Sequence, residues 1–301
     1  MDLWGIDLGG TKVEGVIVDS DDPMKVRCRL RVPTGSANGY DHVVGQIREL
    51  IGQMEQTSGQ KRPSVIGFGT PGAMDSTGVL KNSNSTCLNG RPLRDDLSRL
   101  LGTEVRMTND ANCFALAEAR FGAAKGRRVV FGVIMGTGVG GGIVFDGQAW
   151  NGLHGIGGEW GHNPICGETT PCYCGRVGCV ETVIAGPSLE RFYREITGVS
   201  ARLPEIATKA QAGKPAAVAT LQRLTDKLGV AMAALINILD PDAVVFGGGV
   251  GNLDVIYSEA TRAAIRRHLF NSELRTELLK PALGDSAGVF GAALLAGGGP
   301  R

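Results

Sequence analysis

The sequence predicts an α/β protein with two lobes. Short apolar segments rich in Val and Ile alternate along the chain with segments of helical periodicity, an order that is typical of α/β folds. The chain has 301 residues, which is more than one hydrophobic core usually supports, so two lobes are expected. Its 46 glycines cluster where the expected strands end, which indicates tight turns at those points.

The first expected element is a strand pair. Residues 3–8 are predicted to form a buried strand, Gly9 and Gly10 a turn, and residues 12–18 the returning strand. The same design recurs later in the chain, where residues 129–135 and 140–145 are the strands and residues 136–138 are the turn. We therefore expect two hairpins of one kind.

The remaining elements follow from periodicity and from breaker residues. Apolar residues recur at helical spacing from Ala111 to Phe121, and Gly122 ends that helix. The other expected helices are residues 39–57, 93–101, 216–239 and 288–296, and the other expected strands are residues 65–68, 105–107 and 243–246. We expect residues 1–108, completed by a C-terminal helix at about 286–301, to form the N-terminal lobe and residues 109–285 to form the C-terminal lobe.

Both glycine turns are candidate phosphate-binding loops. Glycine lets backbone N–H groups approach an anion, and the hydroxyls of Thr11 and Thr137 add donors. Either turn alone is equally consistent with an ordinary tight hairpin. Two copies, together with Asp7 as an oxygen ligand or water-mediated partner for Mg²⁺, favour a polyphosphate site. Neither turn is a P-loop, because no Gly-Lys-Ser/Thr follows at Walker spacing.

Asn109 and Asp110 stand where an expected strand ends and a helix begins. Ligands meet open α/β sheets at such junctions. Both residue types are also preferred helix N-caps, and capping would explain one of the two. We expect Asp110 to act as a general base that accepts a proton from a substrate hydroxyl, with Asn109 as its hydrogen-bonding neighbour.

A dense group of soft metal ligands lies in residues 162–179. His162, Cys172, Cys174 and Cys179 stand in a segment rich in Gly and Pro and without apolar periodicity. Four ligands close the coordination shell of zinc, so a structural zinc ion is expected. Cys166 is a fifth, more distant candidate. The alternative is a loop of ordinary reduced cysteines.

Two glutamates flank this group of ligands. Glu159 precedes His162 and Glu181 follows Cys179. A zinc ion that fixes the backbone would also fix these two carboxylates, and rigidly held acceptors suit the hydroxyl groups of a sugar. The alternative is a pair of solvated surface acids.

Composition excludes several classes of function. The net charge is +1 and no basic block is present, so no nucleic-acid partner is expected. The longest apolar run, around residues 230–239, is too short to span a bilayer, and no secretory leader is evident. We expect a cytoplasmic protein without a membrane partner. Seven cysteines, three of them assigned to a metal, fit a reducing compartment.

Six motifs, taken together and in order, resemble those of ROK-family sugar kinases. They are DLGGTK (7–12), NDANCFALAEA (109–119), GTGVGGG (136–142), GEWGH (158–162), CYCGRVGCVE (172–181) and LDPDAVVFGGG (239–249). The resemblance covers essentially the whole chain. It implies an actin-like ATPase (ribonuclease H-like) fold of two lobes around a cleft, in which ATP, Mg²⁺ and a hexose meet, and a zinc-binding loop.

The resemblance also implies roles for individual residues. Asp110 is the catalytic base, and Asn109, Glu159, His162 and Glu181 bind the sugar. His162 serves twice, with one ring nitrogen on zinc and the other toward a sugar hydroxyl. The residues implied to line the phosphates are Gly9, Gly10, Thr11, Lys12, Gly136, Thr137 and Gly138, with Gly248 near the nucleoside.

Within the family, two segments are similar to bacterial fructokinases and manno(fructo)kinases. These are VLKNSNSTCLNG (79–90) and EWGHNP, so fructose is the expected substrate and mannose a secondary one. Asn82, Asn84 and Asn89 are candidate sugar contacts, although Asn, Ser and Gly also make ordinary loops. Cys87 stands where that subfamily carries Trp, which puts the shape of the sugar pocket in question. Glucokinase and N-acetylhexosamine kinase are the alternatives within the family.

Two other functions compete with a sugar kinase. ROK-type sugar-sensing regulators carry an N-terminal helix-turn-helix, and here the first phosphate strand begins almost at Met1, so no DNA-binding module is expected. An actin-like ATPase that acts on protein partners is disfavoured by the zinc ligands and their flanking glutamates. A homodimer is expected from the resemblance alone.

Overall fold

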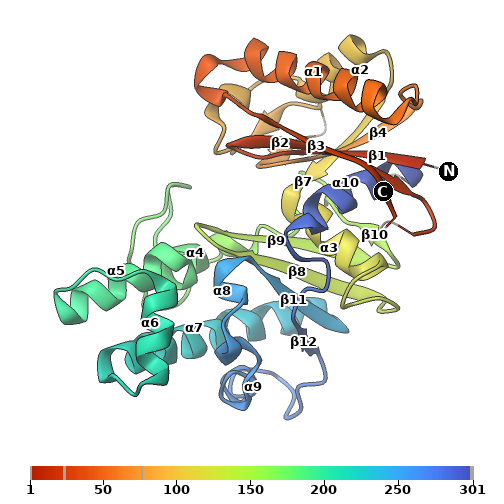
Figure 1. The fold of residues 1–301 in the computed structure, drawn as a ribbon. Coiled ribbons are helices and arrows are strands. Elements are labelled where there is room, and N and C mark those ends of the chain that lie inside the picture. The colour runs from red at the N-terminus through yellow and green to blue at the C-terminus, as the bar shows by residue number, and fades with distance from the viewer. Residues whose placement is uncertain (1, 23–24, 76, 299–301) are drawn as a thin grey trace. The chain divides into compact units, whose positions relative to one another are not determined.

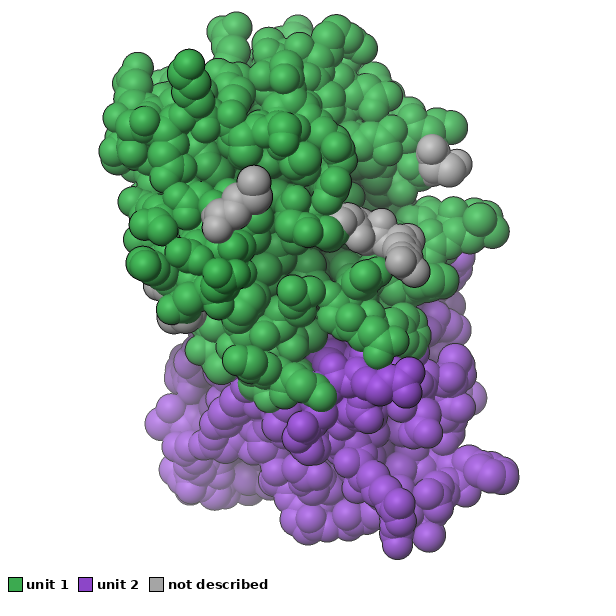
Figure 2. Space-filling model, turned by 90° about the vertical axis from the view of Figure 1, so that its right-hand side faces the viewer, with its two compact units in different colours: residues 1–126, 142–158, 282–301 green, residues 127–141, 159–281 purple. Residues whose placement is uncertain are grey.

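The computed structural model describes residues 2–22, 25–75 and 77–298. The chain divides into two compact units, which Figure 2 colours green and purple. The first unit comprises residues 1–126, 142–158 and 282–301, and the second comprises residues 127–141 and 159–281. This division differs from the expected lobes, because residues 109–126 and 142–158 group with the first unit.

The first unit is built on a five-stranded sheet of order β3-β2-β1-β4-β7 (Figure 1). Its strands are β1 (Asp2–Leu8), β2 (Lys12–Asp19), β3 (Val26–Pro33), β4 (Val65–Thr70) and β7 (Glu104–Asn109). β1 pairs antiparallel with β2 and parallel with β4, and β4 pairs parallel with β7. The carboxyl ends of β1, β4 and β7 therefore meet at one edge of the sheet.

Helices cover both faces of this sheet. The helices of this unit are α1 (Tyr40–Ser58), α2 (Leu93–Leu101), α3 (Asp110–Arg120) and α10 (Ala287–Gly297). The unit also contains a separate two-stranded sheet of β5 (Ala73–Met74) and β6 (Leu80–Lys81). The side chains of α1 and α2 share one hydrophobic core with the sheet, and α10 packs on the opposite face (Figure 1). A Cβ atom at Gly67 would overlap the carbonyl oxygen of Ala292, so glycine on β4 permits this close approach of α10.

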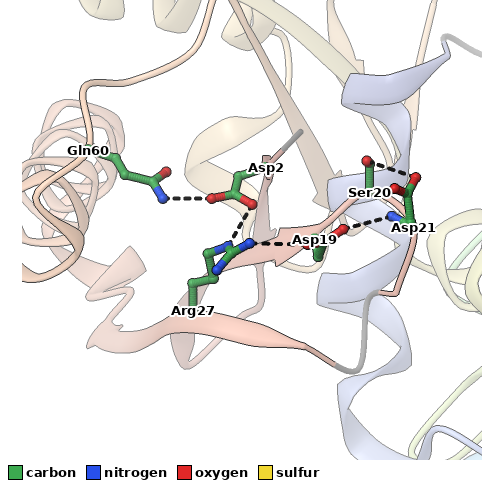
Figure 3. Close-up of polar contacts among 6 residues, drawn as sticks. All are labelled: Asp2, Asp19, Ser20, Asp21, Arg27 and Gln60. Carbon is green, nitrogen blue, oxygen red and sulfur yellow. Dashed lines mark hydrogen bonds and ion pairs between the residues drawn. The ribbon is translucent and has the colours of Figure 1, made fainter.

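The edge strand β3 is held to its neighbours by Arg27 (Figure 3). Its Nε donates to Asp2 Oδ1 on β1 at 2.7 Å, and its guanidinium also donates to Asp19 Oδ2 on β2 at 3.1 Å. Gln60 Nε2, just beyond α1, donates to Asp2 Oδ2 at 2.6 Å. Three strands and the end of a helix are thus joined through polar groups at one place.

A second sheet has the order β10-β9-β8-β11-β12. Its strands are β8 (Val129–Met135), β9 (Val139–Phe145), β10 (Gln148–Ala149), β11 (Ala243–Gly247) and β12 (Glu277–Leu279). The helices of the second unit are α4 (Val180–Ile184), α5 (Gly186–Thr197), α6 (Leu203–Gln211), α7 (Pro215–Leu239), α8 (Gly248–Gly251) and α9 (Glu259–Arg266). β11 pairs parallel with both β8 and β12.

The structure confirms the α/β class and every strand and helix expected from the sequence, with ends shifted by at most two residues. The structure also contains elements that were not expected, namely β3, β5, β6, β10, β12, α4 to α6, α8 and α9. Short 3₁₀ helices also occur at Ser36–Asn38, Thr86–Leu88, Trp160–His162, Asp254–Tyr257 and Gly284–Ser286. In the described part of the chain, no helix has the length and apolar character needed to cross a bilayer.

Candidate functional site

Two acids of the first unit lie at the carboxyl ends of its parallel strands. Asp7, at the end of β1, is in register with Gly69 on β4, which is in register with Thr108 on β7. Asn109 is the last residue of β7, and Asp110 is the first residue of α3. This edge of the sheet is where ligands bind in open α/β folds.

The carboxylate of Asp110 is close enough to Asp7 for its negative charge to raise the pKa of Asp7. Burial, together with the negative charges of Asp110 and Glu14, raises the pKa of Asp7 to about 7 against the opposing effect of Lys12. A divalent cation at this place would offset the repulsion, and carboxylate oxygens are ligands that Mg²⁺ accepts. The donor set therefore fits the expected Mg²⁺.

Asn109 is the N-cap of α3. Its Oδ1 accepts a hydrogen bond from the N–H of Ala111 at 2.8 Å, and its Nδ2 donates to the carbonyl oxygen of Gly72 at 3.0 Å. Asp110 Oδ1 also accepts from the Ala111 N–H at 2.8 Å. Because Asn109 already provides the cap, capping does not require an acid at position 110.

The first glycine turn is closed by its own backbone and by Thr34. The N–H of Gly9 donates to the carbonyl oxygen of Lys12 at 2.9 Å, and Thr34 Oγ1 donates to the carbonyl oxygen of Gly9 at 2.7 Å. Gly10, Thr11 and Lys12 are exposed. The turn therefore offers an accessible backbone next to Asp7, as a phosphate loop requires.

Three asparagines that were expected near a sugar lie in the loop that contains β6. Both ends of the Asn89 amide bond the backbone of Ser83, at 2.8 and 3.0 Å, so this side chain shapes the loop. Asn82 is exposed and has a φ of 57°. Asn84 is exposed, and its Oδ1 lies 3.8 Å from where a Cβ atom of Gly10 would stand. Of the three, Asn84 is the one that lies beside the first glycine turn.

The second glycine turn joins β8 to β9 and is fastened to α4. Gly136 N–H donates to the carbonyl oxygen of Gly138 at 2.9 Å, and Thr137 is exposed. Glu181 Oε2 accepts from the N–H of Val139 at 2.9 Å. One carboxylate oxygen of Glu181 is therefore occupied by the turn, a contact that the sequence did not predict.

Gly248 begins α8, directly after β11. Its φ is 79°, a value that favours glycine, and a Cβ atom there would overlap the carbonyl oxygen of Met135 on β8. Glycine at this position lets the ends of β8 and β11 approach each other, so Gly248 lies beside the second glycine turn of the same unit.

The four expected zinc ligands come together in the second unit. The ligand atoms of His162, Cys172, Cys174 and Cys179 all lie within 4.8 Å of one another. Cys174 Sγ and Cys179 Sγ are 3.6 Å apart, and Cys172 Sγ is 3.6 Å from His162 Nδ1. Tetrahedral zinc with bonds of about 2.0 to 2.3 Å places neighbouring ligand atoms about 3.6 to 3.8 Å apart, so these residues fit the ion.

The segment that carries these ligands is held by polar contacts rather than by regular structure. The N–H of Ile165 donates to the carbonyl oxygen of Gly178 at 2.8 Å. Glu168 forms ion pairs with Arg223 and Lys227 of α7, each at 2.7 Å. Cys166 is exposed and lies outside the metal-ligand group.

His162 turns its second ring nitrogen away from the sulfur atoms. Its Nε2 lies 3.0 Å from the hydroxyl of Tyr173 and 3.9 Å from Glu159 Oε2. Burial raises the pKa of Glu159; the charge of His162 lowers it and that of Glu181 raises it. Glu159, His162 and Tyr173 thus present polar atoms within a few ångströms of one another. Tyr173 stands between two expected ligands, but no sequence pattern predicted a role for it.

Comparisons with known proteins agree on one family. A model of the ROK family matches residues 3–298. The chain is 35% identical over 303 residues to N-acetylgalactosamine kinase AgaK of Shewanella sp. (strain ANA-3), with 98% of this chain and 96% of the relative covered. It is 36% identical over 304 residues to N-acetyl-D-glucosamine kinase of Aliivibrio fischeri, with 97% and 98% covered.

A solved structure agrees with these relatives. The ROK hexokinase from Thermus thermophilus superimposes with a TM-score of 0.87 at 35% identity, and the match covers 98% of both chains.

Proposed function

Because the chain belongs to the ROK family, we propose that it is an ATP-dependent sugar kinase whose substrate is an N-acetylated hexosamine. The observation that carries this proposal is the likeness, over nearly the whole length of the chain, to two kinases of N-acetylated hexosamines. The expectation of fructose, with mannose as a secondary substrate, finds no support in these relatives. We therefore adopt the N-acetylhexosamine alternative.

In this proposal the first unit supplies the base and the metal site. Asp110 accepts the proton of the attacking sugar hydroxyl, whose oxygen forms a bond to the γ-phosphorus while the bond to the leaving ADP oxygen breaks. Asp7 would hold Mg²⁺ directly or through water, and Mg²⁺ would neutralise charge on the phosphates. Gly9 to Lys12 would line the phosphates through their backbone.

The second unit supplies sugar contacts and the second phosphate turn. His162 Nε2 and Glu159 would bond a sugar hydroxyl, and the Glu181 oxygen that Val139 does not occupy would accept from another. Gly136 to Gly138 would line the phosphates, with Gly248 near the nucleoside. Positioning and charge stabilisation dominate phosphoryl transfer, so rigid placement of these groups is their main contribution.

Zinc has a structural part in the proposal. With four protein ligands no coordination position remains for a substrate, so the ion would fix the backbone between Glu159 and Glu181. Without the zinc ion this segment would be more mobile, because it has little regular structure of its own. A homodimer, which rests on the family resemblance, and a cytoplasmic location, which rests on the sequence composition, complete the proposal.

A panel of sugars tests the proposed activity. ADP release is measured by a coupled assay with N-acetylgalactosamine, N-acetylglucosamine, N-acetylmannosamine, fructose, mannose and glucose. We expect kcat/KM for at least one N-acetylated sugar to exceed that for fructose by about tenfold or more, because a site that bonds a particular polar group discriminates strongly when that group is missing. A preference for fructose would show that the proposed substrate is wrong, while the proposed kinase activity would stand. If no hexose supports ADP release, both the substrate and the kinase activity are wrong.

A further inference from the structure

Tyr173 makes a contact that no role above explains. It lies between the expected zinc ligands Cys172 and Cys174, and its hydroxyl is 3.0 Å from His162 Nε2. The two rings meet edge to face, with centroids 5.2 Å apart and planes at 89°. Tyr173 as a whole residue is nevertheless 75% exposed.

The direction of the His162 ring determines which nitrogen carries the proton. Nδ1 faces Cys172 Sγ and lies in the metal-ligand group, so it is unprotonated when it binds a metal. In the neutral ring the proton is then on Nε2, and Nε2–H donates to the Tyr173 hydroxyl. Glu159 Oε2, at 3.9 Å, is too far from Nε2 for a direct hydrogen bond.

We propose that the Tyr173 hydroxyl occupies, in the sugar-free enzyme, the position of the substrate hydroxyl that accepts from His162 Nε2, and that Tyr173 thereby sets the affinity for the sugar. This rests on the proposed function, in which the same nitrogen bonds the substrate. A sugar hydroxyl in place of the Tyr173 hydroxyl can accept a hydrogen bond from His162 and donate one to Glu159. In the structure the Tyr173 hydroxyl contacts His162 and makes no hydrogen bond to Glu159.

The side chain of Tyr173 can move away from His162 without disturbing the rest of the site. Its backbone is fixed by the neighbouring ligands Cys172 and Cys174, and the N–H of Cys172 donates to the carbonyl oxygen of Arg176 at 2.8 Å. The ring can therefore swing about its two side-chain torsions while the metal-ligand group keeps its geometry. Because the side chain is mostly exposed, its hydroxyl bonds water after it leaves.

Tyr173→Phe removes the hydroxyl and keeps the ring. Without the competing hydrogen bond, the sugar should bind more tightly by about 2- to 10-fold, the value of one net hydrogen bond. Kd for the sugar is measured by calorimetry without ATP, and KM and kcat by ADP release, with the best sugar of the panel. We expect Kd and KM to fall together, with kcat and zinc content unchanged. Tyr193→Phe, a second tyrosine of the same unit that packs against Lys209, should change none of these values.

The outcomes separate this inference from the function on which it rests. If the wild-type protein phosphorylates a sugar and Tyr173→Phe binds it equally or more weakly, the inference is overturned and the kinase stands. A loss of zinc from Tyr173→Phe also overturns it, because Tyr173 would then be holding His162 for the metal. If the wild-type protein binds and phosphorylates no sugar, the inference and the proposed function both fail.

Discussion

Asn109 and Asp110 are adjacent, and the side chains of both accept a hydrogen bond from the N–H of Ala111. Asn109 caps α3 and holds Gly72, whereas a cap at this helix does not need Asp110. We predict that Asp110→Asn keeps the fold and the sugar affinity while kcat falls by roughly a hundredfold or more, because the amide cannot accept the hydroxyl proton. The measurements are ADP release, calorimetric sugar binding and thermal unfolding.

Asn109→Ala is the matched comparison for this prediction. Loss of the cap should reduce the free energy of unfolding by about 1 kcal/mol. If Asp110→Asn instead shows that loss of stability together with an unchanged kcat, then Asp110 has a structural role and the proposed base is wrong.

Single-residue contacts were predictable where chemistry restricts the residue type. Zinc needs His and Cys at short spacing, so the four ligands could be named from the sequence and the structure brings them together. The bond from Val139 to Glu181 joins residues 42 positions apart, and no local pattern encodes it. The contact of Tyr173 with His162 depends on the direction of two side chains, which residue spacing does not give.

At the scale of elements, the segment from Glu159 to Glu181 contains the four expected zinc ligands and little regular structure. Apart from one 3₁₀ turn at Trp160–His162 and the start of α4, it has no helix or strand. We predict that Cys179→Ser lowers the zinc content well below the expected ratio of about one per chain, and that the apparent Tm falls because the ion's binding energy is lost. Elemental analysis and thermal unfolding measure the two effects.

Cys166 offers a matched control for the zinc prediction. It is a cysteine of the same segment, but it is exposed and outside the ligand group. Cys166→Ser should therefore keep the full zinc content and the wild-type Tm. Equal zinc content in the two variants, or full activity of a metal-free protein, would rule out the structural zinc.

Helices and strands with a clear hydrophobic periodicity were mostly predicted from the sequence. β3 and β12 were not, for different reasons. β3 alternates Arg27, Arg29 and Arg31 with the more buried Cys28, Leu30 and Val32, a strand pattern of period two that was present in the sequence. β12 has only three residues, too few for any period to be visible. Its place beside β11 is fixed by pairing with a strand more than thirty residues earlier.

At the scale of the whole molecule, the order of the strands was beyond residue patterns alone. α10 packs against β1 and β4, which lie at the other end of the sequence, and the local sign of this packing is a glycine such as Gly67. Many different strand orders would also need a glycine where a helix packs closely on the sheet. The expectation of an actin-like fold with two lobes came from the resemblance to a family, because hydrophobic periodicity alone does not distinguish one strand order from another.

Glu118 joins distant parts of the chain within the first unit. It is fully buried on α3, and its Oε2 accepts from the N–H groups of Ala123 at 2.8 Å and Ala282 at 3.0 Å. Its Oε1 accepts from the N–H of Leu283 at 2.9 Å. The chain first leaves the first unit after Gly126, belongs to it again at residues 142–158, and returns to it for the last time at Ala282. One carboxylate therefore fastens both segments next to two of the points where the chain crosses between units.

Glu118→Gln should loosen both segments, because an amide NH₂ in place of either oxygen faces at least one backbone N–H. Leaving such a buried donor without an acceptor costs about 1–3 kcal/mol of unfolding free energy, and trypsin should cleave faster after the exposed Lys125. Urea unfolding and timed proteolysis measure these changes. Glu104→Gln, at a glutamate whose side chain is 56% exposed, should shift stability by no more than about 0.5 kcal/mol. Equal behaviour of the two variants would mean that these segments are held by their other contacts and that Glu118 does not fasten them.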